Sequence, residues 1–171
     1  MSILEIIKNR RSIRKFQRKE IQRELIDKLG EALIWAPSAG NLQSRKFYFV
    51  SNQKIKKELA MAAPNQDFVA TAPLIIVGCT DEKTALRYGE RGKNLYSICD
   101  TAASIQNMML LAHNEGLGSC WVGTFNDKEV AKILNLPENL RPIAIIPIGY
   151  PAEKPSIPKR LPKTELIKFK E

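Results

Sequence analysis

The sequence predicts a single domain of mixed α+β structure. Its 171 residues leave room for one domain with one substantial core. Apolar residues recur at helical spacing in several segments, whereas other segments are short runs of aliphatic and β-branched residues that are typical of strands. An apolar content of 44% with 26% charged residues is ordinary for a folded domain and argues against a disordered chain.

Two helices are predicted near the N-terminus. Ser2-Ile-Leu-Glu5 has the capping-box pattern, so a short helix should run to about Arg10. A second helix should span residues 22–35 and end before Pro37. Its apolar residues form one stripe at steps of three or four: Leu25, Leu29, Ala32, Leu33 and Ala36.

Predicted strands and helices alternate over residues 36–79. Residues 36–44 are small and polar and form a loop, and residues 46–51 are aromatic and β-branched and form a strand. Residues 54–63 look helical and stop at Pro64. The continuous apolar run over 74–79 is short enough to be a buried strand.

The strongest helical pattern in the chain covers residues 94–115. It follows a polar stretch at 81–93, which we expect to be a loop or short helix, and Gly116 is placed to be its left-handed C-cap. Because its apolar residues spread over much of the circumference, we expect this helix to be central and buried. Those residues are Ile98, Ala102, Ile105, Met109 and Ala112.

Two further strands and one helix are predicted before residue 150. Residues 119–122 should form a strand, and residues 127–134 a helix capped by Asn126 or Asp127. A last strand should cover 141–149. Its two prolines, at positions 142 and 147, would confine it to a sheet edge or break it.

The C-terminal segment should be an extended arm. Half of the ten prolines lie between Pro147 and Pro162, so this segment has little to bury by itself. We therefore divide the chain into one domain at 1–150 and an arm at 151–171. The arm could lie over another subunit, with residues 165–170 adding a strand there.

Rare residues and charge exclude several classes of protein. His113 is the single histidine, so a multi-histidine metal site is excluded and a histidine-based triad is improbable. Three cysteines without C-x-x-C spacing fit the reducing cytoplasm better than a disulfide scaffold or zinc ribbon. No apolar run approaches the roughly 18 residues of a membrane span, and the N-terminus lacks a secretory pattern. An enzyme with these side chains would need a borrowed cofactor.

The first candidate site is Arg10-Arg-Ser-Ile-Arg14. Residues 8–19 carry seven basic side chains and no acidic one, in a chain with a formal charge of +9. The simplest interpretation is a solvated charge run. However, Ile13 and Phe16 would anchor the segment to the core, and anchored arginine forks suit a phosphate group.

Three other segments are weaker candidates on their own. Residues 36–43 could let a flat ligand approach the backbone, or could simply connect a helix to a strand. Residues 116–125 contain G-x-G without the full dinucleotide fingerprint, and Trp121 there could be core packing. Residues 158–162 hold two cations on a stiff, proline-flanked arm, or form a solvated tail.

Taken together, these segments resemble the FMN-dependent nitroreductase family along nearly the whole chain. The matching motifs are R-R-S-x-R at 10–14, P-S-A-G-N-x-Q at 37–43, N-Q-x-F-V at 65–69, the Ala-rich helix at 102–113 with G-L-G-S-C-W-V-G at 116–123, and the basic arm. The resemblance implies a three-layer fold with a mostly antiparallel central sheet flanked by helices. It also implies an intertwined homodimer that exchanges the C-terminal arm and holds two flavins at the interface.

The resemblance implies a phosphate site with contributions from both ends of the chain. Arg10 and Arg11 would face the FMN phosphate, and Ser12 would form a hydrogen bond at the same end. Lys159 and Arg160 would complete the site from the arm.

The flavin ring would be held by other residues. Arg14 would lie near N1 and O2, and Asn65 would meet the pyrimidine edge or the ribityl chain. The backbone of Val122, Gly123 and Thr124 would pass the N5 and O4 edge. The segment that would pack on the flavin from the other subunit consists of Pro37, Ser38 and Ala39, with Asn41 and Gln43 nearby.

The implied activity is reduction of nitroaromatics, quinones or similar acceptors with NADH or NADPH. The flavin would carry the hydride, so no catalytic side chain is assigned, and Arg14 and Gly123 would tune the cofactor. Nucleotide and acceptor would use one face of the flavin in turn, which predicts ping-pong kinetics. His113 and Asp100 are interpreted as structural, and the cysteines as small core residues.

Two departures from the family pattern concern the pocket. Ser44-Arg45 stands where many relatives have Pro-Trp, and no sizeable insertion between Thr80 and Tyr96 forms a lid. Two other functions remain open at this point. A flavin-storage protein would bind FMN without turnover, whereas a basic nucleic-acid-binding module would need exposed aromatics among its cations and has only Phe16.

Overall fold

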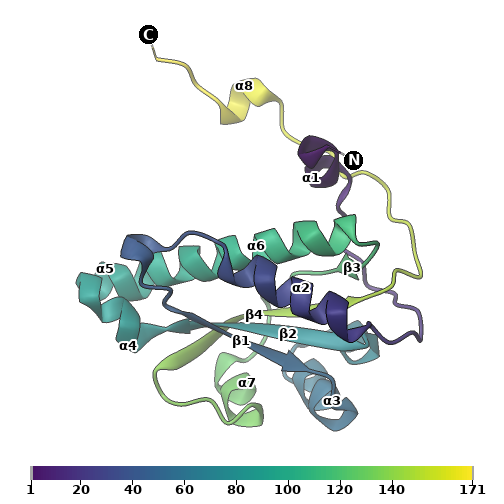
Figure 1. The fold of residues 1–171 in the computed structure, drawn as a ribbon, viewed down its shortest axis with the longest axis horizontal. Helices are drawn as coiled ribbons and strands as arrows, with labels where there is room; N and C mark the ends of the chain where they lie inside the picture. Colours follow the sequence, from purple (N-terminus) through teal and green to yellow (C-terminus); the bar gives the residue numbers. More distant parts are fainter. Residues whose placement is uncertain (1, 171) are drawn as a thin grey trace.

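The computed structural model describes residues 2–170. Within them, four strands form an antiparallel sheet in the order β1-β2-β4-β3, with helices on both faces (Figure 1). The strands are β1 (Arg45–Val50), β2 (Leu74–Asp81), β3 (Gly118–Ser119) and β4 (Leu140–Gly149). Helices α2 (Arg23–Ile34) and α6 (Ser97–Asn114) cover one face, and α3 (Gln53–Met61) and α7 (Asp127–Ile133) cover the other. The predicted three-layer α+β fold is confirmed.

The central strand β2 is buried on both faces, which explains its unbroken apolar sequence. Ile76 packs with Leu29 of α2 and Ile105 of α6 in one core cluster. Its neighbours Ile75 and Val77 point the other way, into a second cluster with the α3 and α7 side. The alternation of side chains along a strand therefore divides one apolar run between two cores.

Strand β4 lies inside the sheet, so the prediction of an edge strand was wrong. It pairs with β2 on one side and with the two-residue strand β3 on the other. Ile145 donates to the Val122 carbonyl on the β3 side, and N–H groups two residues apart point the same way. The missing N–H of Pro147 therefore falls on that side, where it interrupts the ladder between β3 and the Val122 bridge.

The other proline of this strand, Pro142, lies at a bulge. The register between β2 and β4 shifts at Gly78 and Cys79, so that Gly78 faces Ala144 and Cys79 faces Pro142. Ile143 is the extra residue on β4. A bulge already disrupts the ladder, so a residue without an N–H is tolerated there.

Helix α6 ends as predicted but is less enclosed than predicted. Gly116 adopts φ 79°, and the Leu117 amide donates to the Ala112 carbonyl at 2.8 Å, as in a left-handed C-cap. One side of the helix packs on the sheet. The other side keeps Leu110 and Leu111 half-buried in the single chain, so the helix expected to be central and buried is buried on one side only.

The remaining predicted helices form close to their expected bounds. Helix α1 (Ile3–Asn9) has the complete capping box, with the Ser2 amide donating to Glu5 Oε2 at 2.6 Å. Asn126 caps α7 by accepting from the Glu129 amide at 3.2 Å. The polar stretch before α6 forms short helical turns: α4 (Glu82–Ala85), η3 (Leu86–Tyr88), α5 (Gly89–Arg91) and η4 (Gly92–Tyr96). Short 3-10 turns also occur at η1 (Ala39–Asn41) and η2 (Asp67–Thr71).

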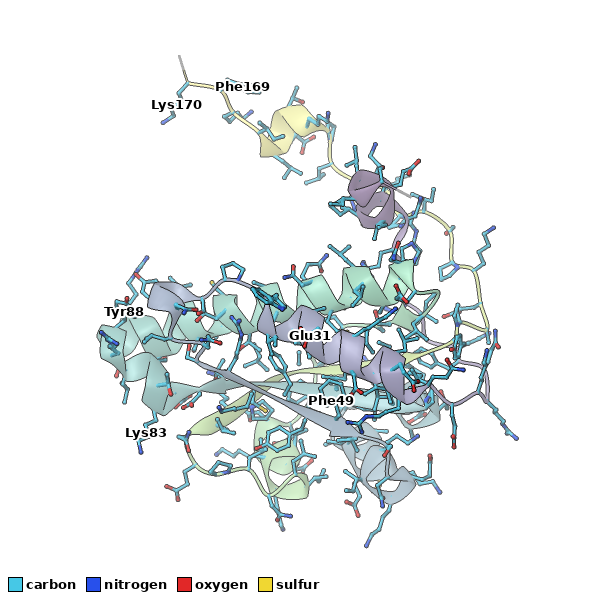
Figure 2. The ribbon with its side chains drawn as sticks, viewed as in Figure 1. Glu31, Phe49, Lys83, Tyr88, Phe169 and Lys170 are labelled. Atoms are coloured by element: carbon cyan, nitrogen blue, oxygen red, sulfur yellow. The ribbon has the colours of Figure 1, made fainter. Side chains whose placement is uncertain are left out.

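The arm after β4 is exposed and extends away from the body. In the single chain it forms one helical turn, α8 (Lys163–Leu166), in place of the strand expected over 165–170. Phe169 and Lys170 lie at its far end (Figure 2), and Phe169 is 90% exposed. None of the helices within residues 2–170 is both long and apolar enough to cross a membrane.

Candidate functional site

The Arg10–Arg14 segment is extended and docked against β3. Ser12 and Ser119 form a parallel bridge, and the Ile13 amide donates to the Ser119 carbonyl at 3.0 Å. Ile13 is 6% exposed and anchors the segment to the core. Because side chains alternate along an extended segment, Arg10, Ser12 and Arg14 share the opposite side.

A close approach between Ile13 and Gly118 sets the position of this segment. A Cβ added to Gly118 would lie 2.6 Å from Ile13 Cγ1, closer than carbon atoms can pack. We expect Gly118→Ala to push the arginine-bearing segment away from β3 and to destabilise the protein by about 1–3 kcal/mol. Urea unfolding checks this, with Gly30→Ala as control because a Cβ there meets nothing within 4 Å. Equal stability of Gly118→Ala and wild type would contradict the packing argument.

Arg10 is half-buried and lacks a partner for one end of its guanidinium. Nη1 is buried and makes no hydrogen bond within residues 2–170. Burial lowers the pKa of Arg10, and the nearby charges of Arg11 and Arg160 lower it further. The arm therefore brings Arg160 close to Arg10 in this structure. An excess of positive charge around a desolvated donor is the arrangement that an anion would satisfy.

A cavity of about 410 Å³ lies against this cluster. Its lining includes Arg10, Arg11, His113 and Glu153, with the backbone of residues 116–119. The Glu153 carboxylate is already engaged, because its Oε1 accepts from the amides of Arg14 at 2.5 Å and Lys15 at 3.1 Å. Arg11 donates through Nη1 to the Lys8 and Arg10 carbonyls, both at 2.7 Å, which fixes the segment after α1.

His113 belongs to the same cluster, although we expected it to be only structural. Its Nε2 is buried without a partner among the described residues. Burial lowers the pKa of His113, and the charges of Arg10 and Arg11 act in the same direction. The imidazole is therefore neutral at pH 7 and offers one further polar atom at the cavity wall.

This lowered pKa predicts acid sensitivity. The unfolded chain takes up a proton on His113 near pH 6.5, before the folded protein does, so stability should fall as the pH drops below that value. We expect His113→Gln to flatten the loss of stability between pH 7.5 and pH 5.5. Urea unfolding at both pH values measures it, and the same fall in variant and wild type would exclude His113 as the cause.

The thiol of Cys120 faces the three aligned residues of the docked segment. Burial raises the pKa of Cys120, whereas the charges of Arg14 and Arg10 and a hydrogen bond from Ser12 lower it. Cys120 therefore lies near Arg10, Ser12 and Arg14, and we call it the floor of this group. It is buried, as is Cys79, but Cys99 is exposed, so the expectation that all cysteines are core residues was wrong for Cys99.

The segment that follows Cys120, residues 122–124, includes backbone amides without an acceptor within residues 2–170. Val122 is buried and exchanges two backbone hydrogen bonds of 3.0 Å with Ile145. Gly123 and Thr124 are exposed, and within residues 2–170 neither amide has an acceptor. A Cβ added at Gly123 would meet only the Trp121 side chain, at 3.5 Å or more, so it would project into open space. Because glycine has no side chain there, that space beside the amides stays open.

Arg14 reaches in the other direction, toward the loop that carries Asn65. Its guanidinium lies over the Phe68 ring, 5.9 Å from the centroid. Asn65 is exposed and adopts φ 60° in the turn before η2, three residues from Phe68. The structure therefore brings the Asn65 loop near Arg14, at the end of the docked segment that is farther along the chain from Arg10.

The Pro37–Gln43 loop lies elsewhere in the single chain. The Ala39 amide donates to Asp100 Oδ1 at 3.0 Å, and Ser44 Oγ donates to Oδ2 at 3.1 Å, which confirms Asp100 as hydrogen-bonded. Asp100 is in the first turn of α6, whereas His113 is in its last. At 1.5 Å per residue these positions are roughly 20 Å apart. One chain alone does not unite this loop with the arginine cluster.

Arg45 holds this loop in shape. It is 6% exposed, and its guanidinium donates to the carbonyls of Ala36 at 2.6 Å, Pro37 at 2.9 Å and Ile34 at 3.2 Å. These carbonyls end α2 and begin the loop. The residue that departs from the common Pro-Trp pattern is therefore part of the loop's internal support, and it provides no apolar wall.

A family model described as the nitroreductase family matches residues 7–63 and 59–150. The chain belongs to the nitroreductase family. The resemblance seen in the sequence motifs is thereby confirmed.

Nitroreductase-family relatives match most of the chain. A protein of Methanothermobacter thermautotrophicus, described provisionally as an NADH dehydrogenase/NAD(P)H nitroreductase, is 35% identical over 91% of this chain and 80% of its own length. The FMN reductase (NADPH) of Bacillus subtilis is 30% identical over 94% of this chain and 70% of its own. The solved structure of the Vibrio harveyi NADPH:FMN oxidoreductase complexed with NAD+ has a TM-score of 0.91 at 28% identity, covering 99% of this chain and 77% of that one.

Some residues of this candidate site could be found from the sequence and others could not. The motifs named Arg10, Ser12, Arg14 and Gly123, and the structure groups the first three around Cys120. The sequence did not predict that His113 and Glu153 line the cavity or that Cys120 lies near Arg10, because these residues come from distant segments that meet only in the fold. Among residues 2–170, histidine, cysteine and acidic side chains form no group of three that could hold a metal ion.

Proposed function

We propose that this chain is an FMN-dependent oxidoreductase that takes hydride from NADH or NADPH and reduces nitroaromatics, quinones or similar acceptors. At the level its relatives share, it is an NAD(P)H-dependent oxidoreductase of the nitroreductase family. The observation that carries the proposal is the buried Arg10 Nη1, which lies among further cations and has no hydrogen-bond partner within residues 2–170. The exposed amides of Gly123 and Thr124 also lack an acceptor in that part of the chain.

The phosphate of FMN fits the Arg10 cluster. A phosphate oxygen would give Arg10 Nη1 the acceptor that it lacks and would offset the mutual repulsion of Arg10, Arg11 and Arg160. Ser12 has a hydroxyl on the same side as Arg10, and Lys159 adjoins Arg160 on the arm. These five residues would hold the phosphate.

The flavin ring would lie toward Arg14 and Gly123. When bound, FMN supplies hydride transfer at its N5 atom. Arg14 keeps its charge at any working pH and would stabilise negative charge at the pyrimidine end of the ring. The free Gly123 amide would donate to the reactive edge, and the absence of a side chain leaves that edge accessible. Asn65 would orient the ring from its loop.

A homodimer would complete the site. In the single chain, apolar side chains are exposed on α1 and along the arm, and they include Ile3, Leu161 and Phe169. The half-buried outer side of α6 offers a surface on which a second copy would bury them. In one chain, residues 37–43 lie at the start of α6 and the arginine cluster lies at its end. If the α6 helices of two subunits ran in opposite directions, the start of one would lie beside the end of the other, and residues 37–43 would meet the partner's arginine cluster.

The expected kinetics are ping-pong. The elements within residues 2–170 form one four-stranded sheet with its helices, and no second sheet is present there to bind a nucleotide separately. Nucleotide and acceptor would therefore use the same exposed face in turn. Initial-rate plots at several acceptor concentrations should give parallel lines, whereas intersecting lines would contradict a shared face.

Arg14→Ala tests the proposed tuning role. We expect reduction by NADPH to slow about tenfold, corresponding to roughly 1.4 kcal/mol in the barrier, and the flavin midpoint potential to fall. Arg14→Lys keeps a charge and should recover part of both effects. Anaerobic stopped-flow and spectroelectrochemistry measure them. An unchanged potential in Arg14→Ala would remove Arg14 from this role.

A further inference from the structure

The basic run at 8–19 is divided between two places in the fold. Arg10 and Arg11 line the cavity assigned to the FMN phosphate. Arg14, Lys15 and Arg18 instead line a separate groove of about 730 Å³, which has no lining residue in common with that cavity. We name it the basic groove. Its other walls come from α3, with Gln53 and Lys57, and from Phe68 in η2.

The four cations of the basic groove form no ion pair within residues 2–170. Ion pairs within residues 2–170 join Arg23–Asp27, Lys28–Glu115, Lys93–Glu82 and Arg141–Asp127, and involve none of the four groove cations. No acidic residue lines the groove. The Glu153 carboxylate beside Arg14 and Lys15 is bound to their backbone amides. Four cations around one concave surface focus a positive potential that attracts a multiply charged anion.

The basic groove continues from the proposed flavin position. Arg14 belongs to both, since it lines the groove and shares the Cys120 floor with Arg10 and Ser12. The Phe68 ring beneath its guanidinium fixes the direction of the side chain. A ligand with one end over the flavin and an anionic remainder could therefore lie along the groove.

We propose that the basic groove binds the phosphate groups of the nicotinamide nucleotide while its nicotinamide ring meets the flavin. This proposal rests on the proposed function and adds a substrate site to it. Both nucleotides carry a diphosphate bridge, and NADPH carries a further phosphate monoester on its adenosine ribose. Arg18 would bind a phosphate with two N–H donors, whereas Lys15 and Lys57 act as point charges.

A pair of charge reversals on α3 tests the groove. Lys57 lines it, whereas Lys54, one turn earlier and equally exposed, does not. Lys57→Glu and Lys54→Glu change the net charge by the same amount, so a general field effect is common to both. We expect Lys57→Glu to raise the KM for NADPH about tenfold with kcat and FMN affinity unchanged, and Lys54→Glu to raise it less than twofold. Arg18→Ala should act like Lys57→Glu.

The choice of nucleotide separates the two phosphate sources. If Lys57→Glu raises the KM for NADPH alone, the groove binds the phosphate monoester on the ribose. If it raises the KM for NADH equally, the groove binds the diphosphate. Equal KM values for Lys57→Glu, Lys54→Glu and wild type with both nucleotides would overturn the proposal.

A binding measurement keeps the test independent of turnover. Adenosine 2′,5′-bisphosphate titrated calorimetrically into the FMN-loaded protein should bind wild type and Lys54→Glu alike, and Lys57→Glu about tenfold more weakly. Undiminished binding to Lys57→Glu would refute the groove site. If neither nucleotide bleached the flavin of wild-type protein, the proposed function would fail, and this titration would still decide whether the groove binds phosphate.

Discussion

Replacing Arg10 with alanine should reduce the affinity for FMN at least about a hundredfold. Arg10 Nη1 is already buried and has no hydrogen-bond partner among the residues that the structure describes, so the protein bears the desolvation cost before any ligand arrives. A phosphate would form charge-assisted hydrogen bonds there, each of about 1.5–3 kcal/mol, and about 2.7 kcal/mol corresponds to a hundredfold change.

The same substitution should not destabilise the flavin-free protein. Burial and the charges of Arg11 and Arg160 both disfavour the charged Arg10 in the folded chain, and alanine removes that cost. Quenching of flavin fluorescence measures affinity, and urea unfolding of the flavin-free protein measures stability. Lys8→Ala, on the exposed end of α1, is the charge-matched control and should change neither. A stability loss in Arg10→Ala equal to its loss in binding energy would indicate a packing role for Arg10 and no phosphate site.

Arg45→Met should destabilise the protein by about 3 kcal/mol or more. Methionine fills a similar volume but leaves the carbonyls of Ile34, Ala36 and Pro37 without the donor that the guanidinium supplies. Each buried polar group left unsatisfied costs about 1–3 kcal/mol, and the Asp100 carboxylate beside Arg45 loses a neighbouring positive charge.

Chemical denaturation measures this effect, with Lys46→Met as the matched control. Lys46 is the next residue of β1 and is exposed, so its replacement should stay within about 0.5 kcal/mol of wild type. If Arg45→Met and Lys46→Met were equally stable, water would donate to the loop carbonyls in the variant, and the Arg45 guanidinium would not contribute to stability. The expected loss also has a consequence for the site, because the Pro37–Gln43 loop that Arg45 supports is the part assigned to the second subunit.

Local signals in the sequence predicted the elements whose ends are decided locally. The Ser2 and Glu5 capping box and the left-handed Gly116 each depend on a few neighbouring residues, so the pattern was sufficient. The strand containing Pro142 and Pro147 was misplaced because proline tolerance depends on the neighbouring strands. Pro142 lies at a bulge, and Pro147 lies where the pairing with β3 is interrupted. Both features depend on the neighbouring strands and cannot be read from the β4 sequence alone.

The same distinction explains what could be predicted of the site. The spacing of Arg10, Ser12 and Arg14 puts them on one side of any extended segment, so their grouping depends on no distant part of the chain. The neutral His113, the Cys120 floor and the engaged Glu153 carboxylate arise from packing between distant segments. The separation of the basic run into a cavity and a groove likewise depends on where α3 and η2 pack.

The central claim is that the Arg10 cluster and the open backbone at Gly123 form a working flavin site. The most direct measurement is anaerobic stopped-flow mixing of the FMN-loaded protein with NADPH and with NADH. The proposed function predicts a yellow protein whose flavin absorbance bleaches within the turnover time and returns when a quinone or nitroaromatic is added. A protein that remains colourless with excess FMN, or that binds FMN but is bleached by neither nucleotide, would contradict it.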